Sequence, residues 1–249
     1  MQVSKSCYSV TGLGAIPPWM VNAGFIVGQE KTLIVDTGMN TLGAQTIYGY
    51  ATAVRPQNTL LAMNLEPHFD HIGGNDFLQR QGATIYGHPK IRRTDAEFQT
   101  EREEYNQTIV NPIRNTAFEA NAFFLDTNVV NPNNSIVTGD TFDLGQAEVE
   151  IIATPGHTAL NLSAYHRDDK VLFCGDCIVN TYIPNLEAGG IDDWHSWLNS
   201  LETIEALSPE VIVPGHGNII HKANVSDEIL RMRDIITTAI KRGKSPTAI

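Results

Sequence analysis

Short apolar runs, separated by glycine, proline or charged residues, recur along the chain, and each has the length of a buried β-strand. In the first third they predict four strands, at residues 20–27, 32–35, 59–63 and 84–86. A helix is predicted between the second and third of these strands, at residues 42–54, after the turn Asp36-Thr37-Gly38.

A second set of apolar runs predicts strands at 141–145, 149–153, 161–165, 171–174 and 211–213. The segment His166-Arg167-Asp168-Asp169 predicts an exposed hairpin turn. From Trp194 to Ile204 apolar residues recur at helical spacing, with Asp193 as the expected N-cap, and a last helix is predicted at 226–242. Two groups of strands, each followed by helices, predict two packed sheets with helices outside.

Residues 91–134 differ from the rest because they are polar and rich in Glu, Asn and Gln. Two helices and a loop suit this composition, so we interpret the stretch as a mainly helical insertion within a single domain spanning residues 1–249. A substrate lid and a small local core both remain open for its aromatic residues, which are Phe98, Tyr105, Phe118, Phe123 and Phe124.

Composition limits the partners. The chain has 249 residues, 42% of them hydrophobic and 18% charged, which is typical of a globular protein with a sizeable core. Its 28 acidic and 17 basic residues give a net charge of −11, which repels phosphate backbones. We therefore expect a small-molecule substrate, with neither nucleic acid nor membrane as a partner, while a homo-oligomer stays open.

Three cysteines are too few for a disulfide scaffold and suit a reducing compartment. Cys174 and Cys177 form a C-x-x-C pair, for which buried packing is favoured over a second metal site or a redox pair. The first residues lack the pattern of a signal peptide, and no apolar stretch approaches the roughly 20 residues that span a bilayer. The predicted location is cytoplasmic.

Four places share one arrangement, in which an apolar run ends and side chains that commonly bind metals follow within a few positions. These are the segment Glu66–His71 and the single residues His157, Asp176 and His216. Strand ends hold side chains rigidly over a cleft, and neighbouring glycines allow close approach. The pattern predicts a metal site.

Spacing within the first segment favours two metals. In extended backbone, residues two apart point the same way, so Glu66 and His68 can reach one metal, whereas the adjacent Asp70 and His71 diverge towards another. The three later donors would bring each metal near the three or four protein ligands of a catalytic site. The Gly73-Gly74 pair is expected to permit a sharp turn into the next helix.

These residues resemble the metallo-beta-lactamase superfamily, whose motif is His-x-His-x-Asp-His, followed by a single His, a single Asp or Cys, and a final His. Here the corresponding positions are Glu66-x-His68-x-Asp70-His71, His157 in TPGHT, Asp176 in FCGDC and His216 in PGHG, and Asp36-Thr37-Gly38 matches the family's Asp-x-Gly turn. The resemblance implies an α/β fold, the four-layer αββα sandwich of that family.

The resemblance also implies roles for these residues. The implied ligands are Glu66, His68 and His157 for the first metal, Asp70, His71 and His216 for the second, and Asp176 as the bridge. A metal-bridging hydroxide would be the nucleophile, and Asp70 would be a catalytic residue that orients it as well as a ligand. Asn180 and Tyr182 follow the bridging residue closely and are expected to contact the substrate.

Glu66 is a departure, because the family usually has His at this position. Two divalent ions carry +4, while Glu66, Asp70 and Asp176 with a hydroxide carry −4, so the site is neutral instead of +1. An extra oxygen donor weakens the first metal as a Lewis acid and favours harder ions. We expect two divalent metal ions, zinc first, with iron and manganese as alternatives.

The predicted function is that of a dinuclear metallo-hydrolase that cleaves an ester, thioester, lactone or lactam bond. Two alternatives remain open: a non-haem di-iron redox protein acting on oxygen or nitric oxide on the same fold, and a non-catalytic metal-binding module. Substrate identity lies in loops that motifs do not decode.

Overall fold

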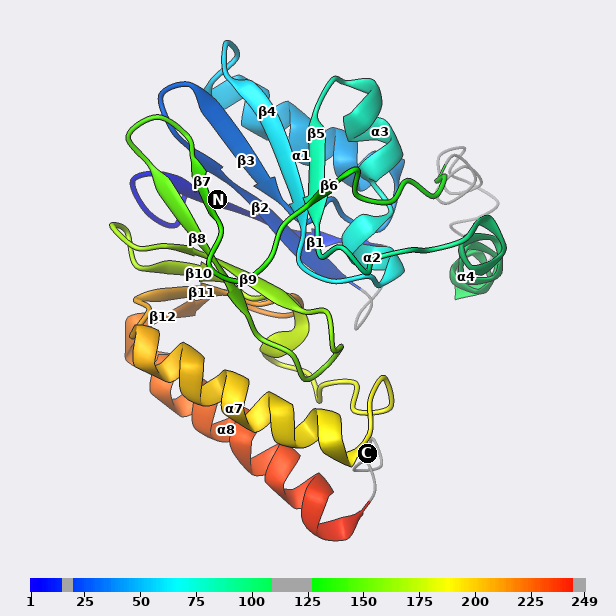
Figure 1. The fold of residues 1–249 in the computed structure, drawn as a ribbon, viewed down its shortest axis with the longest axis vertical. Coiled ribbons are helices and arrows are strands. Elements are labelled where there is room, and N and C mark those ends of the chain that lie inside the picture. Colours follow the sequence, from blue (N-terminus) through cyan, green and yellow to red (C-terminus); the bar gives the residue numbers. More distant parts are fainter. Residues whose placement is uncertain (15–19, 109–126, 244–249) are drawn as a thin grey trace.

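The computed structural model describes residues 1–14, 20–108 and 127–243, and within these residues the strands form two six-stranded mixed sheets (Figure 1). In the first sheet β1 to β3 pair antiparallel and β3 to β6 pair parallel. Its strands, in order, are β1 (Cys7–Leu13), β2 (Val21–Val27), β3 (Lys31–Val35), β4 (Thr59–Asn64), β5 (Thr84–Gly87) and β6 (Asn134–Ser135).

The second sheet is an antiparallel meander from β7 to β10, followed by a parallel pairing of β10 with β11 and an antiparallel pairing of β11 with β12. Its strands are β7 (Thr141–Asp143), β8 (Glu148–Ala153), β9 (Leu162–His166), β10 (Val171–Phe173), β11 (Val211–Val213) and β12 (Ile220–His221). The parallel step requires a long crossover, and a helix in the connection supplies it.

Helices cover the outer face of each sheet (Figure 1). Against the first sheet lie α1 (Thr41–Val54) and α3 (Asn75–Arg80), and against the second lie α7 (Ile191–Leu207) and α8 (Lys222–Arg242). The short α2 (Phe69–Ile72), α4 (Asp95–Thr108) and the 3₁₀ turn η1 (Gly175–Cys177) lie in the connections. The arrangement confirms the predicted αββα sandwich.

Strand period explains why the sequence shows apolar runs instead of alternation. Leu33 and Val35 belong to the core between the two sheets, whereas Ile34 between them packs with Ile47 of α1. Successive strand residues point to opposite faces, and here both faces are buried.

Several boundaries differ from the prediction. Asp193 is not the N-cap of its helix: α7 begins at Ile191, and Asp193 Oδ2 accepts a hydrogen bond of 2.8 Å from the Gly190 backbone N–H. The last helix begins at Lys222, four residues before the predicted start. Strands β1, β6 and β12 were not predicted. Two of them are only two residues long, and polar residues interrupt the third.

Only part of the predicted insertion falls within the described residues. It contains α4, one of the two expected helices, while Phe118, Phe123 and Phe124 lie outside the described residues. Phe98 of α4 is buried, and its ring centroid lies 4.7 Å from that of Phe69. No helix in the described part of the chain has the length and apolar character to cross a membrane.

Candidate metal centre

The structure brings all seven predicted metal donors together at one end of the sandwich. The loop after β4 and the short α2 carry Glu66, His68, Asp70 and His71, and the loops that follow β8, β10 and β11 carry His157, Asp176 and His216. Asp70 and His71 lie on a helical turn instead of in extended backbone, and the donor atoms gather in the two expected groups and in a third, of Glu66, His71 and Asp176, that links them.

The first group consists of Glu66, His68 and His157. His68 Nδ1 lies 3.1 Å from His157 Nε2 and 3.3 Å from Glu66 Oε2. Ligands bound to one metal at 2.0–2.1 Å in tetrahedral geometry are about 3.3 Å apart. The spacing of these donors therefore fits one divalent ion.

The second group consists of Asp70, His71 and His216, in which His216 Nε2 lies 3.2 Å from Asp70 Oδ2. Asp176 faces both groups. Its Oδ2 lies 3.5 Å from His157 Nε2 and 3.3 Å from His216 Nε2, and its Oδ1 lies 3.4 Å from His71 Nε2. This placement fits the bridging role expected of Asp176.

Three of the histidines are oriented through their Nδ1 atoms, which leaves Nε2 facing the centre. His71 Nδ1 lies 2.8 Å from Asp36 Oδ2, and Asp36 also accepts a hydrogen bond from the Leu65 N–H. His157 Nδ1 contacts a backbone carbonyl at 3.0 Å, and His216 Nδ1 contacts another at 2.9 Å; the carbonyls belong to Asn185 and Met20. Such outer contacts fix ring orientation in metal sites.

Two buried amide side chains hold α2 in place through hydrogen bonds. Asn64 donates to the His71 carbonyl at 3.0 Å, and Asn75 donates to Asn64 Oδ1 at 2.8 Å. The Gly73-Gly74 pair forms the predicted turn between α2 and α3, and both residues have ordinary negative φ angles. A Cβ at either position would overlap backbone carbonyls of residues 37 and 39, so the glycines also allow close packing.

The electrostatics fit bound cations. Glu66 Oε1, Glu66 Oε2, His71 Nε2 and Asp176 Oδ1 are buried and have no hydrogen-bond partner among the described residues. Burial raises the pKa of Glu66, but His71 and the other histidines outweigh it and hold that pKa below its ordinary range. Burial lowers the pKa of His68, yet Glu66 raises it to about 9. Buried polar atoms without partners are costly, and divalent ions would satisfy them.

A cavity of about 230 Å³ opens beside the donors. Besides the site residues, Glu101 and Asn185 line it, together with a mainly apolar wall made of Phe69, Tyr105, Val179, Tyr182 and Ile183.

Of the two residues expected to contact substrate, Tyr182 lines this cavity. Asn180 is not one of its lining residues; its backbone N–H donates to the His216 carbonyl at 2.9 Å. Arg231 of α8 donates to the backbone carbonyls of Val179 and Tyr182 and so anchors this wall.

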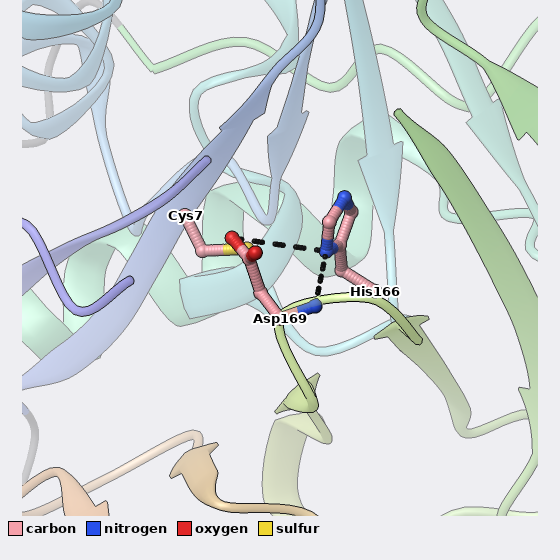
Figure 2. Close-up of side chains that lie close together, drawn as sticks. All are labelled: Cys7, His166 and Asp169. Carbon is pink, nitrogen blue, oxygen red and sulfur yellow. Dashed lines mark hydrogen bonds and ion pairs between the residues drawn. The ribbon is translucent and has the colours of Figure 1, made fainter. Parts of the chain in front are cut away.

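A second group of potential ligands consists of Cys7, His166 and Asp169, whose side chains lie close together (Figure 2). The predicted turn after β9 exists, but the expectation that His166 is exposed was wrong: it is 2% exposed, because β8 and β10 flank it. His166 Nδ1 accepts the Asp169 N–H, and Asp169 Oδ2 accepts from Ser4 Oγ at 2.6 Å and the Ser6 N–H at 2.7 Å. Burial raises the pKa of the Cys7 thiol to about 12. We interpret this group as a structural tie between the N-terminal segment and the β9–β10 turn.

Cys174 and Cys177 are both fully buried with free thiols, as the packing interpretation of the C-x-x-C pair expected. Cys174 Sγ lies within reach of backbone carbonyls of Gly175 and Val213. The Cys177 carbonyl accepts the indole N–H of Trp197 at 2.7 Å, which fixes η1 on α7.

Comparison with known proteins agrees with this geometry. A family model described as the Metallo-beta-lactamase superfamily matches residues 66–216. An acyl-coenzyme A thioesterase, MBLAC2, of Homo sapiens is 24% identical over 253 residues, covering 91% of this chain and 89% of that protein. A hydroxyacylglutathione hydrolase of Rhodospirillum rubrum is 30% identical over 122 residues, or 46% of each chain. A metallo-beta-lactamase from Pontibacter korlensis has the same fold, with a TM-score of 0.67 at 19% identity over 94% of this chain and 97% of that one.

Proposed function

Because this chain belongs to the metallo-beta-lactamase superfamily, we propose that it is a metal-dependent hydrolase that cleaves acyl thioesters. The observation that carries the proposal is the pair of donor groups beside a cavity whose wall is mainly apolar. Similarity to an acyl-coenzyme A thioesterase and to a hydroxyacylglutathione hydrolase supports a thioester over a lactam or a lactone.

The donors fit two divalent ions in spacing, burial and unsatisfied charge. Glu66, His68 and His157 would hold the first ion, Asp70, His71 and His216 would hold the second, and Asp176 would bridge them. Zinc stays our first choice of metal, with iron and manganese next. Such ions supply a water ionised near neutral pH and polarise the carbonyl oxygen of the substrate.

The remaining chemistry belongs to the chain. The Asp70 carboxylate lies at the cavity wall, and from there it would orient the attacking water and accept its proton. Tyr182 and Ile183 provide apolar surface for the acyl part of the substrate. Glu101 also lines the cavity, but Arg93 Nη2 lies 2.7 Å from its Oε1, which reduces repulsion of an anionic carrier. Hydrolysis adds water across the C–S bond and releases a carboxylic acid and a thiol.

The test is a substrate panel assayed with protein of known metal content. We expect release of thiol from acyl-coenzyme A and S-acylglutathione, loss of activity on chelation, and its return with zinc, manganese or iron. Cleavage of lactams or lactones without cleavage of thioesters would refute the thioester assignment. Full metal occupancy with no turnover on the whole panel would refute hydrolysis. Tight iron with oxygen consumption would favour the redox alternative instead.

A further inference from the structure

Glu66 stands where the sequence motif of the family has histidine, and its two oxygens face different donor groups. We propose that Glu66 bridges the two metals, with Oε2 on the first and Oε1 on the second, so that two carboxylates, Glu66 and Asp176, link the pair. This inference rests on the metal centre in the proposed function, and it changes our sequence-based expectation that Glu66 serves the first metal alone.

Geometry separates the two oxygens. Oε2 lies 3.3 Å from His68 Nδ1 and 3.8 Å from His157 Nε2, and both of these histidines belong to the first group. Oε1 lies 2.9 Å from Nε2 of His71, which belongs to the second group. The donor atoms of Glu66, His71 and Asp176 also lie within 4.8 Å of one another. Oε1 therefore lies where it could share a cation with His71 Nε2.

The contact between Glu66 and His71 is an ion pair when the His71 imidazole is protonated, and it joins two metal-donor atoms when the imidazole is neutral. Both atoms are buried and without a hydrogen-bond partner among the described residues, although they are 2.9 Å apart. His71 Nδ1 is already directed at Asp36, so in neutral His71 the lone pair of Nε2 points towards Glu66. Two electron-rich atoms this close are favourable when both donate to one cation.

The identity of the residue makes the bridge feasible. A histidine at this position has one nitrogen available for a metal, because the two ring nitrogens point in different directions, whereas a carboxylate has two oxygens that can bind separate ions. With Glu66 shared, the first metal has four protein donors, counting Asp176, and the second has five. The extra oxygen donor in the second set makes manganese and iron stronger competitors of zinc at that position than they would be without it.

Metal titrations of single-site variants test the bridge. His157→Ala removes a donor of the first group and leaves the second site to be measured, and His216→Ala does the reverse. Glu66→Gln, which preserves shape, is then added to each background, and Mn²⁺ and Zn²⁺ affinities are measured by calorimetry with elemental analysis. Glu30→Gln, an exposed residue, is the matched control. Circular dichroism confirms that each variant is folded.

We expect Glu66→Gln to weaken the remaining site at least tenfold in both backgrounds. A loss only in the His216→Ala background would make Glu66 a ligand of the first metal alone and overturn the bridge, and no loss in either background would also overturn it. Because these titrations use no substrate, their outcome is separate from that of the thioester panel. Loss of metal affinity in both backgrounds, together with no thioester turnover by the wild-type protein, would refute the proposed function but support the bridging role of Glu66.

Discussion

Replacing Gly215 with alanine tests the close fit between the His216 loop and the Asp176 carboxylate. An added Cβ would lie 2.8 Å from the Gly175 carbonyl carbon and 3.0 Å from the Asp176 nitrogen, and it would overlap Asp176 Oδ1. Ordinary van der Waals contact begins at 3.4 Å. To remove the clash with the Gly175 carbonyl carbon alone, the two loops must therefore move apart by about 0.6 Å. This exceeds the positional tolerance of roughly 0.5 Å for the side chains of a functional site.

The displacement should reduce metal affinity at least tenfold and turnover about a hundredfold. The crowding itself should cost about 1–3 kcal/mol of stability, measured by thermal unfolding of the metal-free chain. Metal content is counted after dialysis at fixed free zinc. Gly49→Ala is the control, since a Cβ there meets nothing within 4 Å, and it should raise stability by about 0.5–1 kcal/mol as a helix-interior replacement. Gly215→Ala with a full metal complement and normal turnover would show the reasoning to be wrong.

Asp36→Asn should weaken metal binding about ten- to a hundredfold, because Asp36 contacts the candidate ligand His71 at 2.8 Å; an unchanged affinity by calorimetry would contradict this. Ile183→Ser should lower kcat/KM for medium-chain acyl thioesters by about fourfold for each methylene group of the acyl chain that no longer packs against the wall. Leu230→Ser changes a similarly exposed residue on α8 and should leave kcat/KM unchanged. Equal effects of the two changes would refute the role of the apolar wall in binding the acyl chain. Asp169→Ala should cost about 3 kcal/mol at pH 7, because it removes two hydrogen bonds to a carboxylate, each taken at the low end of the range for a charged acceptor. Burial raises the pKa of Asp169, but hydrogen bonds from the N-terminal segment lower it overall. Its contribution is therefore present above the unfolded pKa of about 4 and lost as pH falls through the folded pKa. If chemical denaturation shows that Asp169→Ala lowers the free energy of unfolding equally at pH 7 and pH 3, the ionised carboxylate is not the origin of the loss.

The sandwich was predictable because its central strands are buried on both faces and so appear as continuous apolar runs. Strands β6 and β12 escaped prediction because two residues are too few to form a pattern. His166 was misjudged because its neighbours in the turn are polar, while its burial depends on pairing with Val149 and Val171.

The convergence of the seven candidate metal donors was predictable because each combines a ligand-type side chain with the end of an apolar run. The atoms that orient them were less accessible to sequence reasoning. The carbonyls of Met20 and Asn185 carry no side-chain signal, and any residue type offers the same group. Asp36 had a signal, as a buried acid after a strand, but only the fold shows that it contacts His71. The bridging role that we propose for Glu66 depends on side-chain direction, which spacing alone does not give.

Each predicted ion would take its ligands from both sheets, with two or, where Glu66 is shared, three from the segment after β4, one histidine from a loop of the second sheet, and Asp176. Bound ions would therefore cross-link the two sheets of the sandwich. Free metal at a hundred times the dissociation constant contributes about 2.7 kcal/mol of folding free energy for each site. In a cell short of metal, a larger fraction of this protein would therefore be unfolded. Proteases would then degrade it faster, in addition to any loss of activity.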